Sequence, residues 1–118
     1  MLEYRDEFGR LHRIDGPARS WSEGSEEWYE HGKLHRCGGP AYMDANGRKV
    51  WMQNGLFHRT DGPAVEGRNG QKAWYLNNQK ISRKLFNKLF KGSKKDLLLL
   101  MGQGFDKIIA ERLKNNEN

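Results

Sequence analysis

A block that begins at glycine recurs every 23 residues along the first two thirds of the chain. Its three copies start at Gly9, Gly32 and Gly55 and read GRLHRIDGPA, GKLHRCGGPA and GLFHRTDGPA. In each copy a glycine follows seven residues after the proline, and a tryptophan follows four residues after that glycine. A fixed period without a register slip is typical of stacked supersecondary units, which bury apolar surface only against their neighbours. We therefore predict a small array whose function lies on a repeated surface.

The composition does not favour a deep core. Of the 118 residues, 36% are hydrophobic and 31% are charged, which suits a thin sheet closed by helices. The one cysteine, Cys37, excludes an internal disulfide. The longest apolar run, 97–101, is far shorter than the roughly 20 residues that cross a bilayer, and the first residues lack the features of a secretion signal. We expect a cytoplasmic protein without a membrane span.

Two turn signals in each copy predict an antiparallel meander. Asn46-Gly47 and Asn69-Gly70 suit two-residue hairpin turns, in which both residues take positive φ. In the second signal, Asp-Gly-Pro-Ala, glycine permits unusual dihedral angles and proline fixes φ, so the chain reverses before the next strand. The predicted fold class is mainly β (α+β), an antiparallel β-meander of three 23-residue hairpin repeats over residues 1–81, capped by C-terminal helices. Strands are expected at 41–45, 48–53, 64–68 and 71–76.

After Ile81 the periodicity of the apolar residues becomes helical. Ser82 and Ser93 are suitable N-caps for two helices, and a third helix is expected over 105–114. The last repeat of such an array exposes an apolar surface that a capping element has to bury. We therefore predict that residues 82–118 form a basic helical cap, packed on the array as one structural unit.

Positive charge is concentrated in this tail. Residues 1–81 hold 12 Lys and Arg against 11 Asp and Glu, whereas residues 82–118 hold 9 against 4, so the two parts carry net charges of +1 and +5. Such a segment attracts an anionic partner, and phosphate contacts give non-specific affinity for nucleic acid. These charges give two interpretations of the tail. The simpler one is a helix face that is exposed to solvent, and the other is a surface that binds nucleic acid, which we keep as an alternative function of the protein. The six residues of this run are Arg83, Lys84, Lys88, Lys91, Lys94 and Lys95.

Histidines recur in register at His12, His35 and His58. With strands about 4.8 Å apart and two main strands per copy, equivalent residues lie roughly 9 to 10 Å apart, whereas ligands lie about 2.0 to 2.3 Å from a zinc ion. We therefore expect no metal site and no other cofactor, and a structural role for these imidazoles. Because His and Asp belong to the repeated framework and not to one unique pocket, we expect no catalytic residue and no enzyme.

Arginine and tryptophan also recur in register. The arginines either lock the Asp-Gly-Pro turn through its Asp, or face solvent and bind an acidic protein surface or phosphates. The tryptophans form a ladder along the sheet, which is either core or an aromatic binding surface. We take both sets as candidate partner-binding residues: Trp28, Trp51, Trp74, Arg13, Arg36 and Arg59.

Residues 28–34 (WYEHGKL) and 51–56 (WMQNGL) resemble MORN-type repeats, especially the variant of bacterial antitoxin-like repeat proteins. The HRxDGPA block resembles the form found in bacteriophage and giant-virus proteins. If the protein is viral, this resemblance implies the host cytoplasm as its location. The resemblance covers about residues 4–81 and implies a curved antiparallel sheet that binds proteins and, in some cases, lipid. It implies a non-enzymatic protein-binding module, an inhibitor or antitoxin-like protein that blocks a host or partner protein of unknown identity. Because the first strand of such a sheet has an open edge, pairing into a homodimer is a further expectation.

Overall fold

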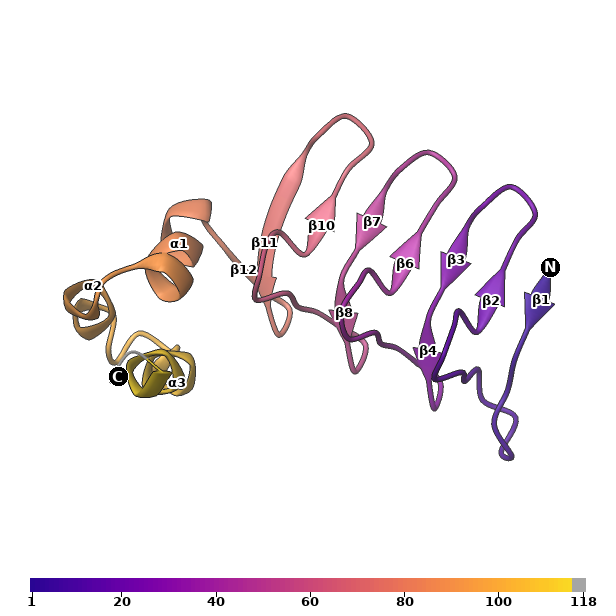
Figure 1. Ribbon diagram of the computed structural model, residues 1–118, viewed down its shortest axis with the longest axis horizontal. Coiled ribbons are helices and arrows are strands. Elements are labelled where there is room, and N and C mark those ends of the chain that lie inside the picture. The colour runs from indigo at the N-terminus through magenta and orange to yellow at the C-terminus, as the bar shows by residue number, and fades with distance from the viewer. Residues whose placement is uncertain (116–118) are drawn as a thin grey trace. The chain divides into compact units, whose positions relative to one another are not determined.

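The computed structural model describes residues 1–115 and divides into two compact units, Met1–Lys80 and the chain from Ile81 onward. An antiparallel sheet has eight strands in the order β1-β2-β3-β6-β7-β10-β11-β12, beside two smaller sheets, β4-β5 and β8-β9 (Figure 1). Neighbours in the large sheet follow one another along the chain, so the predicted meander is confirmed. The strands are β1 Leu2–Glu3, β2 Arg19–Ser20, β3 Glu26–Glu27, β4 Tyr29–Glu30, β5 Lys33–Leu34, β6 Tyr42–Met43, β7 Lys49–Val50, β8 Met52–Gln53, β9 Leu56–Phe57, β10 Val65–Glu66, β11 Lys72–Leu76 and β12 Gln79–Ile81.

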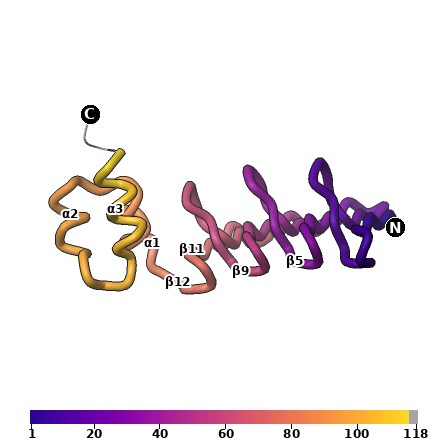
Figure 2. The backbone as a smooth tube through the Cα atoms, turned by 90° about the horizontal axis from the view of Figure 1, so that it is seen from below, coloured from indigo at the N-terminus to yellow at the C-terminus, as the bar shows by residue number. Residues whose placement is uncertain are grey.

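Each copy of the repeat contributes hairpins at two ends of the sheet unit. The hairpins β2-β3, β6-β7 and β10-β11 pair side by side in the large sheet. The hairpins β4-β5 and β8-β9 lie at the other end and do not pair into one sheet. Figure 2 shows these successive copies as a row of equivalent loops. The repeat therefore places equivalent residues in rows along the unit.

Most strands are shorter than predicted, and the chain turns at Trp28 and Trp51, whereas β11 continues through Trp74. The expected strand 48–53 is divided at Trp51 into β7 and β8. The Trp51 N–H donates to the carbonyl of Ala64 at 2.7 Å, and the Trp51 carbonyl accepts the N–H of His58 at 3.1 Å. These partners belong to different parts of the next copy, so the tryptophan is the corner between the two sets of hairpins. Trp28 makes the equivalent bonds one copy earlier.

The sequence predicts positive φ at both residues of Asn46-Gly47 and Asn69-Gly70, and this prediction was wrong. Gly47 has φ +94°, but the asparagine before it does not take positive φ. The carboxylate of Asp44 instead accepts the N–H groups of Asn46 and Arg48, both at 3.0 Å, which stabilises a longer turn. Two-residue turns with positive φ at both positions lie at the opposite end of the unit, where Asn54-Gly55 has φ values of 53° and 79°.

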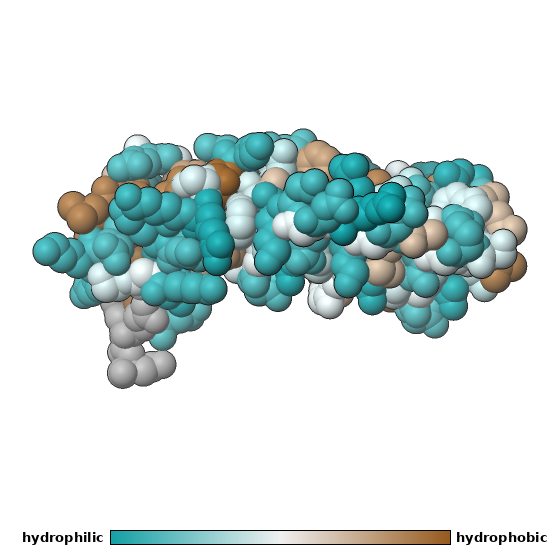
Figure 3. All heavy atoms as spheres, turned by 90° about the horizontal axis from the view of Figure 1, so that it is seen from above, coloured by the Kyte–Doolittle hydropathy of each residue, from teal (hydrophilic) through white to brown (hydrophobic). Residues whose placement is uncertain are grey.

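Small side chains form much of the core of the sheet unit. Ala18, Ala41 and Ala64, the last residues of the three Gly-Pro-Ala turns, are fully buried, and Val50 and Leu76 are nearly so. The repeated tryptophans are half-buried. The face drawn in Figure 3 is largely hydrophilic, in keeping with a core only one side chain deep.

Three helices form the second unit: α1 Arg83–Lys91, α2 Lys94–Leu99 and α3 Asp106–Asn115. Both predicted N-caps are present, because Ser82 Oγ accepts the Leu85 N–H at 3.0 Å and Ser93 forms a capping box with Asp96. No helix among residues 1–115 is long and apolar enough to span a bilayer. The deepest core of this unit consists of Phe86, Leu89, Leu97 and Ile109.

Candidate functional site

Two clefts open along the array, one between the turns of the first and second copies and one between those of the second and third. Their volumes are about 240 and 350 Å³. Gln53 and Thr60 occupy in the second cleft the places that Glu30 and Cys37 occupy in the first. Four further residues line both clefts in equivalent places, so the two clefts are related sites. Ile14 lines only the first cleft, and Gly38, Gly39, Pro40 and Asp61 line only the second. The repeated residues are Arg13, Trp28, His35 and Arg36 in the first cleft, and Arg36, Trp51, His58 and Arg59 in the second.

Each cleft arginine is held between an aromatic ring and its own turn. The Cζ atom of Arg36 lies 3.7 Å from the ring centroid of Trp28, and Arg59 repeats this distance over Trp51. The Nη1 group of Arg36 also donates to the carbonyl of Pro40 at 3.1 Å. The arginines and tryptophans predicted to bind a partner therefore also hold the framework together.

The turn glycines leave room for these guanidinium groups. A Cβ atom built on Gly39 would lie 2.7 Å from the Cζ atom of Arg36, and the equivalent distances in the first and third copies are 2.6 and 2.8 Å. A side chain at these positions would displace the guanidinium group, so the glycines provide space for it. The sequence-based explanation by unusual dihedral angles was wrong, because none of the three takes positive φ.

Two of the three arginines pair with the aspartate of their own turn. Arg13 Nε donates to Asp15 at 3.2 Å, and Arg59 Nε donates to Asp61 at 2.8 Å. Gly38 replaces this aspartate in the second copy, and no carboxylate of residues 1–115 forms an ion pair with Arg36. The turn-locking role predicted for the Arg–Asp pair therefore applies in the first and third copies.

The repeated histidines connect adjacent copies through their backbone. In each case Nδ1 accepts the backbone N–H of the positive-φ residue that directly precedes the start of the next 23-residue interval. The neutral imidazole therefore carries its proton on Nε2. This arrangement agrees with the structural role predicted for these side chains. The pairs are His12 with the His31 N–H at 2.9 Å, His35 with the Asn54 N–H at 2.9 Å, and His58 with the Asn77 N–H at 3.1 Å.

A thiol, an imidazole and a carboxylate meet in the first cleft. His35 Nε2 lies 2.9 Å from Glu30 Oε2 and 3.7 Å from Cys37 Sγ. Because Nδ1 of His35 accepts the Asn54 N–H, the proton on Nε2 points to Glu30 and the imidazole has no lone pair for the thiol proton. His35 therefore does not act as the general base that activates a cysteine nucleophile in a Cys–His pair. Cys37 itself is exposed, in contrast to the half-buried position that its place in the repeat predicts.

The first hairpin contains a cluster that sequence reasoning missed. Asp6, His12 and His31 place possible ligand atoms within 4.8 Å of one another. The first hairpin turn is one residue longer than its equivalents, so the period gives no signal for Asp6. The rings of His12 and His31 stack with centroids 4.1 Å apart and planes at 23°. Their lone pairs therefore lie in two nearly parallel planes, an arrangement that does not favour binding of one ion by both rings.

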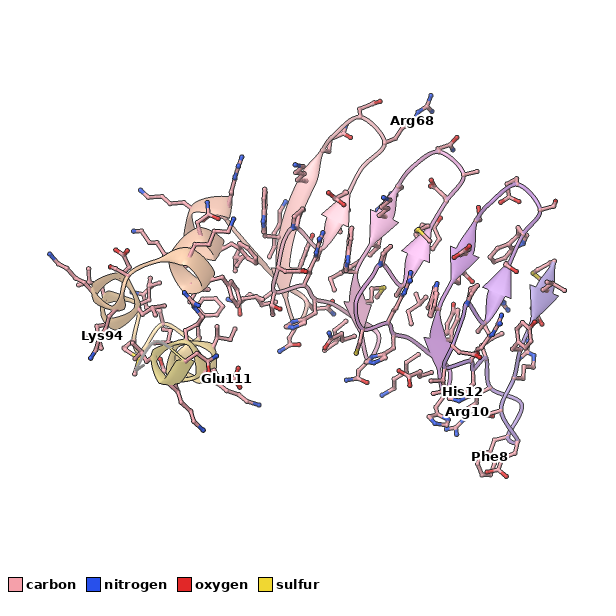
Figure 4. The ribbon with its side chains drawn as sticks, viewed as in Figure 1. Phe8, Arg10, His12, Arg68, Lys94 and Glu111 are labelled. Atoms are coloured by element: carbon pink, nitrogen blue, oxygen red, sulfur yellow. The ribbon has the colours of Figure 1, made fainter. Side chains whose placement is uncertain are left out.

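An arginine already occupies the position that a cation would take in this cluster. Arg10 Nε lies 2.9 Å from Asp6 Oδ2, and His31 Nδ1 lies 3.1 Å from the same atom. Burial acts to raise the pKa of Asp6, but hydrogen bonds from His31 and from the backbone N–H groups of Arg10 and Phe8 outweigh it, so the pKa is held well below its usual range. Figure 4 shows Phe8, Arg10 and His12 at this end of the first copy. We interpret the cluster as an ion-pair network that closes the first hairpin.

The remaining predicted residues lie outside the two clefts. Trp74 is half-buried in β11, away from both linings. The six cations of the tail run are all exposed in the helical unit, where Figure 4 labels Lys94. The structure therefore brings the arginines together with two of the three tryptophans and places the tail cations on a separate surface.

No protein-family model matches the chain, and neither a curated protein nor a solved structure matches it at a significant level. The clefts are therefore interpreted from their own geometry and chemistry.

Proposed function

We propose that the sheet unit is a non-enzymatic protein-binding module, which inhibits a host or partner protein by occupying a site on it, as a phage-type inhibitor or an antitoxin-like protein does. The observation that carries this proposal is the pair of related clefts. A surface that repeats in register presents the same rings and donors at regular intervals. That arrangement suits an extended contact with a macromolecule, whereas a small substrate is usually bound in one enclosed pocket.

The cleft walls have the residue types that dominate protein interfaces. Tryptophan and arginine are enriched among the residues that contribute most to binding, and here they hold one another in place before any partner arrives. Few side chains of the cleft walls therefore have to become ordered when a partner binds, which lowers the entropic cost of association. The exposed Ile14 lines the first cleft, and the exposed Thr60 lines the second.

The proposal is tested by capture of a partner from a nuclease-treated lysate. The double variant Ile14→Glu, Thr60→Glu places a charge in the lining of each cleft without touching an arginine stack. The matched control is Arg68→Glu, at the tip of the β10-β11 hairpin (Figure 4). We expect the wild-type protein and the control to recover one defined protein and to reduce its activity, and the double variant to lose both effects. Failure of the wild-type protein to retain any partner contradicts the proposal.

A second candidate function is nucleic-acid binding by the helical unit. All six cations of the tail run are exposed, and the only acidic residue in α1 and α2 is Asp96. The Asp96 carboxylate is engaged by Ser93, whose backbone N–H and hydroxyl hydrogen bonds lower the pKa of Asp96, with smaller contributions from Lys88 and Lys95. This leaves a strongly positive surface for phosphates.

Electrophoretic mobility at about 50 mM salt tests this candidate, because counterion release makes phosphate contacts strongest at low salt. Changing Lys84, Lys88, Lys91 and Lys95 to Glu should remove binding. Reversal of Lys107 and Lys114 in α3 is the control and should weaken binding less. The absence of retardation by the wild-type protein at this salt contradicts nucleic-acid binding.

We also propose that β1 provides a homodimer contact. β1 pairs with β2 on one side only, and Leu2 in this strand is 63% exposed. Such an open edge offers backbone groups to a second copy. Light scattering of the wild-type protein and of the variant Leu2→Lys tests this contact. We expect a dimer for the wild-type protein and a monomer for the variant. A wild-type protein that stays monomeric at high concentration contradicts the proposal.

A further inference from the structure

Arg36 has a fixed orientation and unused hydrogen-bond donors. Its guanidinium plane is set by the Trp28 ring at 3.7 Å and by the bond from Nη1 to the carbonyl of Pro40. A guanidinium has five N–H donors in a planar fork, and one bond to Pro40 leaves most of them available. The equivalent Nε–H groups of Arg13 and Arg59 are bonded to aspartate, whereas that of Arg36 is not, because Gly38 has no side chain.

The second cleft is more favourable for an anion than the first. Arg36 and Arg59 both line it, and neutral Gln53 stands where Glu30 lines the first cleft. The one carboxylate of its lining, that of Asp61, is already bonded to Arg59 at 2.8 Å. One positive charge in this cleft is therefore without a carboxylate among residues 1–115.

We propose that the second cleft binds an acidic side chain of the partner protein, whose carboxylate takes at Arg36 the place that Asp15 and Asp61 take in the other copies. The sister copies supply the geometry, because their carboxylate oxygens accept from Nε at 3.2 and 2.8 Å. A charge-assisted bond to a guanidinium already held in place requires little further ordering. The inference rests on the proposed function and deepens it: the partner presents an acidic segment to the turn of the second copy.

The site is tested without the partner by titration of the isotope-labelled protein. The probe is the blocked tripeptide acetyl-Gly-Glu-Gly-amide, with its Gln counterpart as the matched control, and the readout is the NMR signal of each arginine Nε–H. We expect the Glu peptide to shift the signal of Arg36 and the Gln peptide to leave it unchanged. Inorganic phosphate is the third probe: a response of Arg36 to phosphate but not to the Glu peptide overturns the assignment to a carboxylate. No response to any probe overturns the site.

The variant Asp61→Gly provides an independent check, because it gives the third copy the residue that Gly38 is in the second and removes the acceptor of the Arg59 Nε–H. The Asp61 side chain is 82% exposed, so its replacement should preserve the fold. We expect Arg59 to respond to the Glu peptide in this variant and not in the wild-type protein. An Arg59 signal that stays unchanged in the variant contradicts the proposed mode of binding.

Measurements on the captured partner distinguish this inference from the proposed function. We expect Arg36→Gln to weaken the partner complex by about tenfold or more, and Arg36→Lys, which keeps the charge but loses the fork, to fall between. Circular dichroism establishes that each variant is folded. Full-strength binding by folded Arg36→Gln overturns the inference and leaves the proposed function standing. If the wild-type protein captures no partner, the proposed function fails and the peptide titration alone decides whether Arg36 accepts carboxylates.

Discussion

His35 in the second copy accepts the backbone N–H of Asn54, the residue directly before the third copy, at 2.9 Å through its Nδ1 atom. The next N–H, that of Gly55, donates to the carbonyl of Leu34 at 2.8 Å. Together these bonds hold the turn of one copy against the strand of the copy before it. The imidazole therefore helps to set the spacing between copies, on which the geometry of both clefts depends.

Removal of this acceptor should destabilise the sheet unit. Because the Asn54 N–H would lose its protein partner, we expect His35→Ala to lower the free energy of unfolding by about 0.5 to 1.5 kcal/mol, measured by urea titration. His35→Phe keeps a ring of similar size without the acceptor and serves as the control for packing. A loss in the Ala variant that the Phe variant does not share would show that the hydrogen bond contributes little.

The contact between Gly39 and Arg36 gives a second prediction. Gly39→Ala should destabilise the protein by about 1 to 3 kcal/mol, because the new Cβ would displace the guanidinium from the Trp28 ring. In an Arg36→Ala background the same change should cost much less. A double-mutant cycle on these two positions measures the coupling. Equal costs in both backgrounds would mean that the glycine is required for another reason.

The fold could be predicted largely because the repeat is visible in the sequence. A period of 23 residues with turn residues in register defines hairpins laid side by side, whatever their detailed strand lengths. The helical unit was predictable from its own local signals, since Ser82 and Ser93 are followed by apolar residues at helical spacing. These features depend on residues close together in the chain.

The candidate site could be predicted only in part. Recurrence identified Arg36 and Trp28 as candidates, but the stack between them depends on how the chain turns at the tryptophan, which no local pattern records. The Asp6 cluster was not predictable, because the longer first hairpin breaks the period and His31, the residue directly before the second copy, lies beside it. The geometry of both sites depends on contacts between residues that lie far apart in the chain. The residue types alone do not specify these contacts.

Acid should destabilise the sheet unit through His58. Burial lowers the pKa of His58 from its ordinary value of 6.5, so the unfolded chain takes up this proton more readily than the folded one. The contribution of His58 is therefore fully present above pH 6.5 and is lost as the pH falls below that value. We expect the urea midpoint to be lower at about pH 5.5 than at about pH 7.5, and His58→Phe to reduce the difference. The same midpoint shift in the variant would assign the effect to other groups.

The capping box of α2 gives the last prediction. Ser93 Oγ accepts the Asp96 N–H at 3.2 Å, and Asp96 Oδ2 accepts the Ser93 N–H at 3.1 Å. Because α2 has only six residues, these bonds are a large part of what holds its first turn. Ser93→Ala should lower the free energy of unfolding of the helical unit by about 0.5 to 2 kcal/mol, followed by circular dichroism in urea. Ser22→Ala, at an exposed turn of the sheet unit, is the control and should leave the helical signal unchanged. An unchanged helical transition in Ser93→Ala would show that packing of Leu97 alone maintains α2.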